Sequence, residues 1–262
     1  MTSRDWIADR EAVFDRDAFT CQQCGDDEPA TLHPYPIGDV PLEDAVHESA
    51  LVTVCEVCFN ALEPSLAAAS IESDALFHRV RDATRLQGET ISDLAAFASL
   101  STSLPATLES ARDDGTEVDS DDAVSEYQHT RRDVLLAIAL VDARLEELAA
   151  LESAVDSDVR PSLLAFTETA TALQSTLIEA VELSETVVSA LERCHGCFAP
   201  LEEETCSTCG LEARETADWH DIGGSIAFDQ LFATINETLQ DAAETTDTLT
   251  DRTTALAAQL TT

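Results

Sequence analysis

Eight cysteines are the residues of this chain whose spacing most directly indicates chemistry. They form four C-x-x-C pairs with none left over: Cys21/Cys24, Cys55/Cys58, Cys194/Cys197 and Cys206/Cys209. Two residues between thiolates let both sulfurs of a tight turn face one tetrahedral ion, and two such pairs complete a four-sulfur set. The pattern predicts two structural Zn²⁺ sites. Redox dithiols and iron centres are the alternatives.

The second set of cysteines is compact. It reads CHGCFAPLEEETCSTCG, with eight residues between its two pairs. This spacing is similar to that of zinc ribbons, in which two tight turns face each other across a short hairpin, and it predicts a ribbon over residues 194–212. His195 lies between two predicted ligands and could replace one of them, although the four cysteines suffice. Such ribbons contact proteins and nucleic acids alike.

Long stretches of apolar residues at alternating spacings of three and four predict the helices that carry these sites. They predict a helical segment at 64–112, a long helical hairpin at 123–193 and a carboxy-terminal helix at 225–262. Residues 113–122, DDGTEVDSDD, read as an acidic linker, and residues 213–224 as a connection. The expected fold is mainly α: a long coiled-coil-like helical bundle that carries a small ββα zinc finger within residues 1–63 and the compact ribbon.

The apolar seams of the helices do not indicate what they pack against. Their apolar positions suit packing within one chain, self-association, or docking of a helix from another protein. One position, Arg131, interrupts the seam of the first arm of the hairpin.

The charge of the chain is strongly acidic. The formal net charge is −38, all 14 positive residues are arginine, and the 52 carboxylates run along the whole sequence. Molar salt shortens the screening length to about 3 Å and makes such self-repulsion tolerable. The composition therefore indicates a salt-adapted, haloarchaeal cytoplasm, in preference to an acidic interaction tail, which would form one block.

The sequence contains no apolar run near the roughly 20 residues needed to cross a bilayer, and its amino terminus lacks a hydrophobic signal core. We therefore expect a cytoplasmic protein with no membrane partner. A reducing compartment favours metal binding by the cysteines over disulfides.

The first cysteine region resembles the HNH endonuclease family over residues 4–63. The resemblance rests on three segments: VFDRDAFTCQQCG at 13–25, LHPYP at 32–36 and SALVTVCEVCFN at 49–60. It implies a ββα-metal (treble-clef) finger whose four cysteines hold a structural zinc. In that family a separate magnesium-class ion supports cutting, and a histidine removes a proton from the attacking water.

Aligned on this motif, the general base falls on His33, but the other catalytic positions depart. Leu32 and Phe59 stand where the family has its metal-binding histidines, and Ala50 stands where it has the asparagine that orients the base. Hydrocarbon side chains offer no lone pair to a hard cation. The resemblance thus implies a degenerate catalytic motif, and Phe59 is expected to pack under the finger.

Two functions follow from the resemblance. The first is a non-catalytic, zinc-binding helical scaffold for a protein or nucleic-acid partner. The second is an endonuclease that uses His33 with Mg²⁺ or Mn²⁺, for which His47 could supply a substitute ligand together with Asp39, Glu43 or Asp44. Arg16 could meet a phosphate or pair with neighbouring acids.

The amino-terminal region offers no basic stripe for nucleic acid. Residues 1–60 contain three arginines and 13 acids, a balance of −10. Phosphate binding normally needs a local positive face. Nucleic acid therefore stays a possible partner without a visible basic patch.

Overall fold

The computed structural model describes residues 6–38, 46–63, 71–114 and 117–260. The expected mainly α fold is confirmed, because the described residues form six α-helices, two short 3-10 helices and a two-stranded sheet. The elements in chain order are α1 (Trp6–Arg16), β1 (Leu32–Pro36), η1 (Glu48–Ala50), β2 (Leu51–Cys55), α2 (Glu56–Leu62), α3 (Ser73–Asp114), α4 (Glu117–Leu151), α5 (Arg160–Ala190), η2 (Ala217–Trp219) and α6 (Phe228–Leu260).

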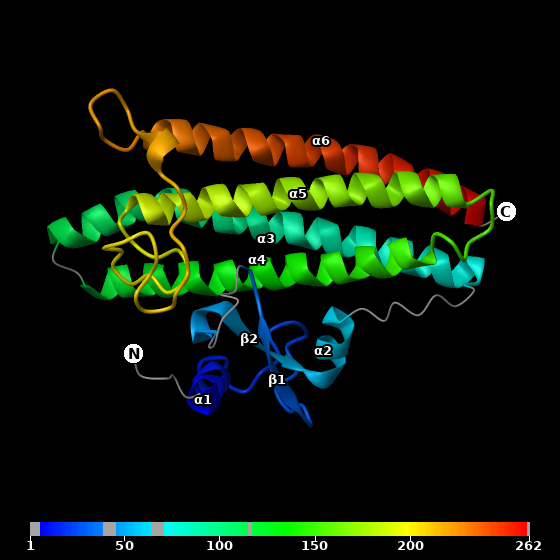
Figure 1. Ribbon diagram of the computed structural model, residues 1–262, viewed down its shortest axis with the longest axis horizontal. Helices are drawn as coiled ribbons and strands as arrows, with labels where there is room; N and C mark the ends of the chain where they lie inside the picture. Colours follow the sequence, from blue (N-terminus) through cyan, green and yellow to red (C-terminus); the bar gives the residue numbers. More distant parts are fainter. Residues whose placement is uncertain (1–5, 39–45, 64–70, 115–116, 261–262) are drawn as a thin grey trace.

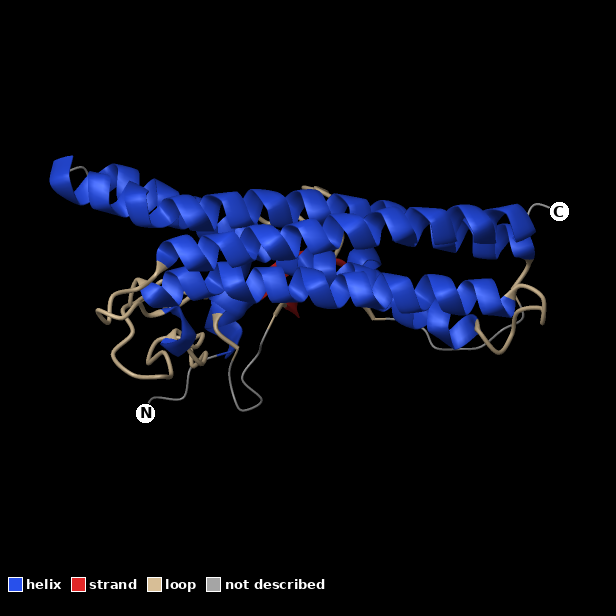
Figure 2. Ribbon diagram, turned by 90° about the horizontal axis from the view of Figure 1, so that it is seen from above, coloured by secondary structure: helices blue, strands red, loops and turns tan. Residues whose placement is uncertain are grey.

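The four long helices α3 to α6 form an antiparallel bundle in which each helix runs opposite to the one before it (Figure 1). α3 packs against α4, α5 and α6, and α5 also packs against α4 and α6. The predicted seams supply the core, whose buried members include Leu94, Phe97, Val134, Ile138, Val141, Leu163, Phe166, Leu173, Leu177, Ala242, Leu249 and Leu256. Seen from above, the loops gather at the two ends of the bundle (Figure 2).

The prediction of an acidic linker at 113–122 is wrong. α3 continues to Asp114 and α4 begins at Glu117, so residues 113, 114 and 117–122 are helical. Residues 115 and 116 lie outside the described residues. Ala111 and Tyr127 are buried near the facing ends of the two helices. Because extending a helix anchored in a core costs little per residue, the acids are carried as further helical turns.

Most of the helical segment expected at 64–112 lies in one long helix, α3. It continues without a break through Gly88 and Pro105. Pro105 removes one backbone hydrogen bond, but Phe97 and Leu104 are fully buried on its amino-terminal side. Packing of this stripe against the bundle holds the helix together across the proline.

The turn between α4 and α5 starts the next helix without a side-chain cap. α5 begins at Arg160 with Pro161 in its first turn, and the N-cap residue, Val159, makes no side-chain cap hydrogen bond. Asp158 accepts a hydrogen bond from Ser157 Oγ instead.

The amino-terminal finger lies along α4 (Figure 1). Strands β1 and β2 pair antiparallel with His33 opposite Val54. α2, β2 and η1 all contact α4, and Leu136 and Leu140 of α4 join the buried cluster of the finger. Because these leucines lie one turn apart and outside the bundle seam, α4 is apolar on two faces.

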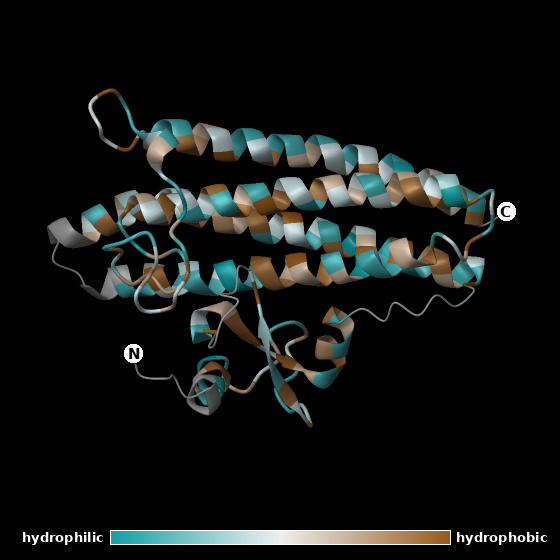
Figure 3. Ribbon diagram, viewed as in Figure 1, coloured by the Kyte–Doolittle hydropathy of each residue, from teal (hydrophilic) through white to brown (hydrophobic). Residues whose placement is uncertain are grey.

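The ribbon region connects α5 to α6 in the chain and lies at the end of the bundle where α3 ends and α4 begins (Figures 1 and 2). Each bundle helix carries polar and apolar residues along its whole length (Figure 3). Correspondingly, none of the helices in the described part of the chain is long and apolar enough to span a membrane.

Candidate metal centres and the buried charge cluster

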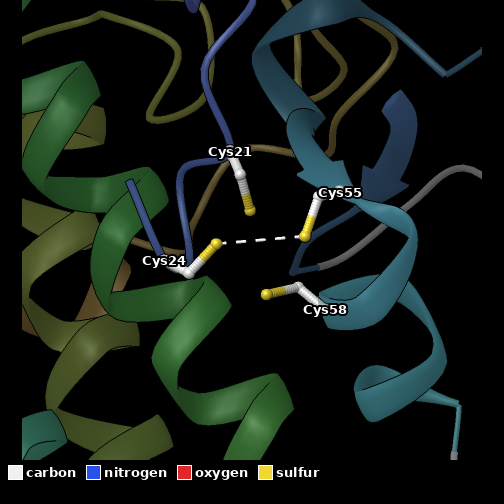
Figure 4. Close-up of side chains that lie close together, drawn as sticks. All are labelled: Cys21, Cys24, Cys55 and Cys58. Atoms are coloured by element: carbon white, nitrogen blue, oxygen red, sulfur yellow. Dashed lines mark hydrogen bonds between the residues drawn. The ribbon is translucent and has the colours of Figure 1, made fainter. Parts of the chain in front are cut away.

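The two predicted cysteine sets each come together in space. Within each set the four Sγ atoms all lie within 4.8 Å of one another. The Sγ atoms of Cys24 and Cys55 are 3.9 Å apart in the first set, and the four sulfurs converge on one point (Figure 4). In the second set, Cys194 and Cys209 are 3.4 Å apart at Sγ, and Cys197 and Cys206 are 3.6 Å apart.

These separations fit a metal ion better than a disulfide. A tetrahedron of thiolates around Zn²⁺, with bonds of about 2.3 Å, places its sulfurs about 3.8 Å apart. A disulfide would bring two sulfurs to about 2.05 Å, and all eight cysteines are free thiols. Each tetrad can therefore hold one metal ion.

Three of the four pairs share one local backbone pattern, the knuckle. In the finger, Cys21 N donates to Asp26 O and Gly25 N donates to Cys21 O. The ribbon repeats this twice: Cys194 N donates to Ala199 O and Phe198 N to Cys194 O, whereas Cys206 N donates to Leu211 O and Gly210 N to Cys206 O. The turn brings the two thiols of each pair onto one side.

The fifth residue of each knuckle adopts a left-handed backbone, which favours glycine. Gly25 has φ of 72° and Gly210 has φ of 77°, but the corresponding residue in the third knuckle is Phe198, with φ of 63°. Its ring packs against Tyr127 in the bundle, at 6.0 Å between ring centroids. Contact with the bundle thus offsets a strained backbone.

The fourth pair is built differently. Cys55 ends β2 and caps α2, and Cys58 lies in the first turn of that helix. The first tetrad therefore joins a knuckle, the end of a hairpin strand and a helix N-terminus, whereas the second joins two facing knuckles. Arg193 and Pro200 pair across the first ribbon turn, and Thr205 and Glu212 pair across the second.

Some of the eight thiols hold their protons more firmly than an ordinary cysteine does, because their pKa is raised. Burial raises the pKa of Cys58, and a hydrogen bond with Cys194 raises the pKa of Cys209 to about 12. Because a metal binds the thiolate form, uptake must release these protons. Metal affinity should consequently fall as the pH is lowered.

His33 lies beneath an aromatic ring. The rings of His33 and Phe59 are 4.7 Å apart at their centroids, and Tyr35 meets Phe59 edge-on at 6.2 Å. The His33 Nε2 atom is buried and has no hydrogen-bond partner among the described residues. Phe59 packs against the finger cluster, as the sequence indicated.

The other residues singled out in the finger have local roles. His47 is buried and caps η1, because its Nδ1 accepts from Ser49 N at 3.0 Å. Asp39, Glu43 and Asp44, its suggested co-ligands, lie outside the described residues.

Arg16 makes structural contacts. It donates to both carboxylate oxygens of Asp17 and to the backbone carbonyls of Glu48 and Leu51. Asp17 in turn accepts from Thr53 N at 2.8 Å. Of the two interpretations of Arg16, pairing with a neighbouring acid is the one observed. The Arg16–Asp17 pair ties α1 to β2.

His195 takes no part in the second tetrad and instead faces a buried charge cluster between ribbon and bundle. Its Nε2 lies 3.9 Å from Glu185 Oε2, too far for a hydrogen bond. Tyr127 donates to the His195 carbonyl at 3.0 Å. Burial lowers the pKa of His195, so the ring is neutral at pH 7.

Glu185 is the centre of this cluster, which also contains Arg131, Arg214 and His195. Arg131 Nε donates to Glu185 Oε1 at 2.6 Å, and Arg214 Nε donates to Glu185 Oε2 at 2.7 Å. Glu185 is fully buried. Burial by itself would raise its pKa, but the neighbouring positive charges, Arg131 foremost, hold that pKa below the ordinary value of 4.5.

Comparisons with known proteins found no match for this chain. A scan against protein-family models gave no match, and searches of curated proteins and of solved structures also gave none.

Proposed function

We propose that the protein is a non-catalytic, zinc-stabilised helical scaffold that binds another protein, and that its amino-terminal finger is of the HNH type without a working catalytic site. The main observation behind this proposal is that the Phe59 ring packs over His33. The buried Nε2 of His33 lies under the Phe59 ring, where a nuclease of that family would bind its cutting ion. A base must reach the attacking water within hydrogen-bond distance.

Zinc is the ion that suits both tetrads. Four thiolates in a closed tetrahedral set, with no open position for water, are typical of structural zinc. The all-sulfur donor set of each tetrad favours zinc over the hard cations, which prefer oxygen ligands.

A protein partner suits the surface charges better than nucleic acid. Several arginines already pair with acids: Arg16 with Asp17, Arg79 with Glu147, and Arg85 with Glu89. A phosphate backbone would need free positive side chains gathered on one face. We therefore expect duplex and single-stranded DNA to bind weakly in an anisotropy titration at any salt concentration at which the chain is folded.

The second candidate is an HNH endonuclease that uses His33 with Mg²⁺ or Mn²⁺. It draws support from the lack of a hydrogen-bond partner on His33 Nε2, since a structural histidine normally has one.

Cleavage of supercoiled plasmid DNA separates the two candidates. The assay is run in molar KCl with Mg²⁺ or Mn²⁺, and it compares the wild type with His33→Ala and with His78→Ala, a matched change at an exposed histidine on α3. We expect no cutting above background by any of the three. Cutting that persists in His78→Ala and disappears in His33→Ala would establish the endonuclease and overturn the scaffold.

A further inference from the structure

A cavity of about 330 Å³ lies where the finger, the bundle and the chain after the ribbon meet. β1 and the following turn supply Tyr35, Pro36 and Gly38, α4 and α5 supply two walls, and Arg214 closes one side. Ligand sites are concave, largely apolar and common at such junctions. The cavity is distinct from both cysteine tetrads and from His33.

One end of the cavity is formed by Arg131, whose side chain is only 2% exposed. Among the described residues its guanidinium donates one hydrogen bond, from Nε to Glu185. Nη1 is buried with no partner, and Nη2 lies 3.7 Å from the point where a Cβ on Gly38 would stand. A Cβ there would also come within 3.0 Å of Leu135 Cδ1, so Gly38 lets the turn after β1 pass close to Leu135 and the guanidinium. Buried N–H groups without acceptors are rare in folded proteins and call for a partner.

The acids around Arg131 do not supply that partner. Glu185 is shared with Arg214, which binds it at 2.6 Å through Nη2 and also approaches Glu182 at 3.4 Å through Nη1. Asp142 lies eleven residues further along α4, roughly 16 Å away at the rise of an α-helix, and accepts from Gln174. The guanidinium groups of Arg131 and Arg214 therefore balance the carboxylates of Glu185 and Glu182 in charge, and they offer more N–H donors than these carboxylates use.

The walls between Arg131 and Asp142 are apolar. Leu135, Ile138 and Ala139 face the cavity from α4, and Ile178 and Val181 face it from α5. Ile178 is 39% exposed, which is unusual for a large apolar side chain in this chain. The space is large enough for a small organic molecule.

We propose that this cavity binds a small organic carboxylate, with its carboxylate on the Arg131 guanidinium and its hydrocarbon body against Leu135, Ile138 and Val181. A planar guanidinium matches a carboxylate with two parallel hydrogen bonds, and such charge-assisted bonds are stronger than neutral ones. This inference is independent of whether the finger cuts DNA.

Isothermal titration calorimetry on the full chain, with both metal sites loaded, tests the proposal. The probes are benzoate and isovalerate, with benzamide as the neutral analogue of the first. We expect saturable binding of at least one carboxylate and binding of benzamide weaker by about tenfold or more. The proposal is overturned if neither carboxylate binds, or if benzamide binds as well as benzoate.

Two substitutions on α4 locate the site. Ala139→Leu fills the apolar part of the cavity, whereas Ala150→Leu makes the same change on the same helix outside it. Circular dichroism establishes that both variants fold. We expect Ala139→Leu to weaken carboxylate binding by at least about tenfold and Ala150→Leu to leave it unchanged. Equal binding by wild type and Ala139→Leu would place the carboxylate elsewhere and refute the assignment.

Arg131→Gln tests the polar contact itself. It removes the charge but keeps a donor, so binding of the carboxylate should fall while that of benzamide stays the same. If this variant does not fold, the two α4 alanine variants decide the question without it.

Discussion

Phe59 covers His33, with 4.7 Å between the centroids of their rings. This contact predicts that His33 reacts slowly with reagents that modify imidazoles. Carbethoxylation followed by mass spectrometry of the peptides measures this directly. In the wild type we expect the His33 peptide to react more slowly than the peptide of His78, whose side chain is 51% exposed. In Phe59→Ala, His33 should react faster and His78 at its original rate. Equal rates for the two histidines in the wild type would contradict the covered site.

Removal of the metal should separate the small units from the bundle. The main core draws its buried residues almost entirely from α3 to α6, whereas the finger and the ribbon each depend on a tetrad. Structural zinc contributes apparent free energies of about 10–16 kcal/mol to small fingers. We expect a strong chelator to release two ions per chain, while circular dichroism retains most of the helical signal. Cys24→Ser with Cys58→Ser should lower the count to one ion. Loss of most helix together with the metal would show that the bundle is not independent.

The buried pair Arg131 and Glu185 predicts strong coupling in a double-mutant cycle. Removing either partner alone leaves a buried charge, at a cost of about 3–5 kcal/mol, whereas replacing both with apolar residues is often neutral or stabilising. Arg131→Met and Glu185→Leu should each destabilise the protein in denaturant titrations. The double variant should recover part of the loss, because Arg214 also loses its bonds to Glu185. Additive losses in the double variant would argue against the pair.

The same pair predicts how stability depends on pH. The folded-state pKa of Glu185 is held below its ordinary value of 4.5, so the unfolded chain binds its proton first as the pH falls. The stabilisation is fully present above about 4.5 and is lost as the pH falls through the folded-state pKa. Relative to the double variant, the wild type should therefore lose stability on acidification below this value. Because both proteins carry the same cysteines, the difference reports Glu185 together with its positive neighbours, Arg131 foremost.

Two glycines provide a matched pair of substitutions with opposite signs. A Cβ on Gly196 would overlap Leu211 Cδ1 in the ribbon, whereas a Cβ on Gly88, within α3, meets nothing within 4 Å. Gly88→Ala should stabilise the chain by about 0.5–1 kcal/mol, because alanine favours the helix. Gly196→Ala should destabilise it by about 1–3 kcal/mol through overpacking. Thermal unfolding of both variants with metal bound measures the signs.

The sequence predicted those parts of the fold that depend on local spacing. The cysteine pairs indicated which thiols meet, and the apolar seams indicated α5 and α6. The acidic segment before Tyr127 was wrongly predicted to be a linker. Its many carboxylates argue against an isolated helix, but the local sequence does not show that the residues on either side are anchored in the core. The dependence on molar salt stays a prediction; loss of the helical signal in dilute buffer would support it.

The contacts between units could not be predicted in the same way. Leu136 and Leu140 form a second apolar stripe on α4, visible in the sequence, but nothing in it identifies the finger as the surface they meet. Arg131 was noticeable as the one charge within a seam, yet its partner Glu185 lies 54 residues away. Pairings over such distances depend on how the helices are arranged, which a single sequence does not specify.

Phe198 closes a metal-binding turn and also reaches the bundle beside Tyr127. If the ribbon were grafted onto an unrelated protein, the aromatic side chain of Phe198 would be left in water and nothing would offset its strained backbone. If the ribbon were exchanged for a foreign one, a gap would open beside Tyr127. Any relative of this protein should accordingly vary the two segments together, so that an aromatic residue after the C-x-x-C pair accompanies a bulky residue at the facing position of the helix.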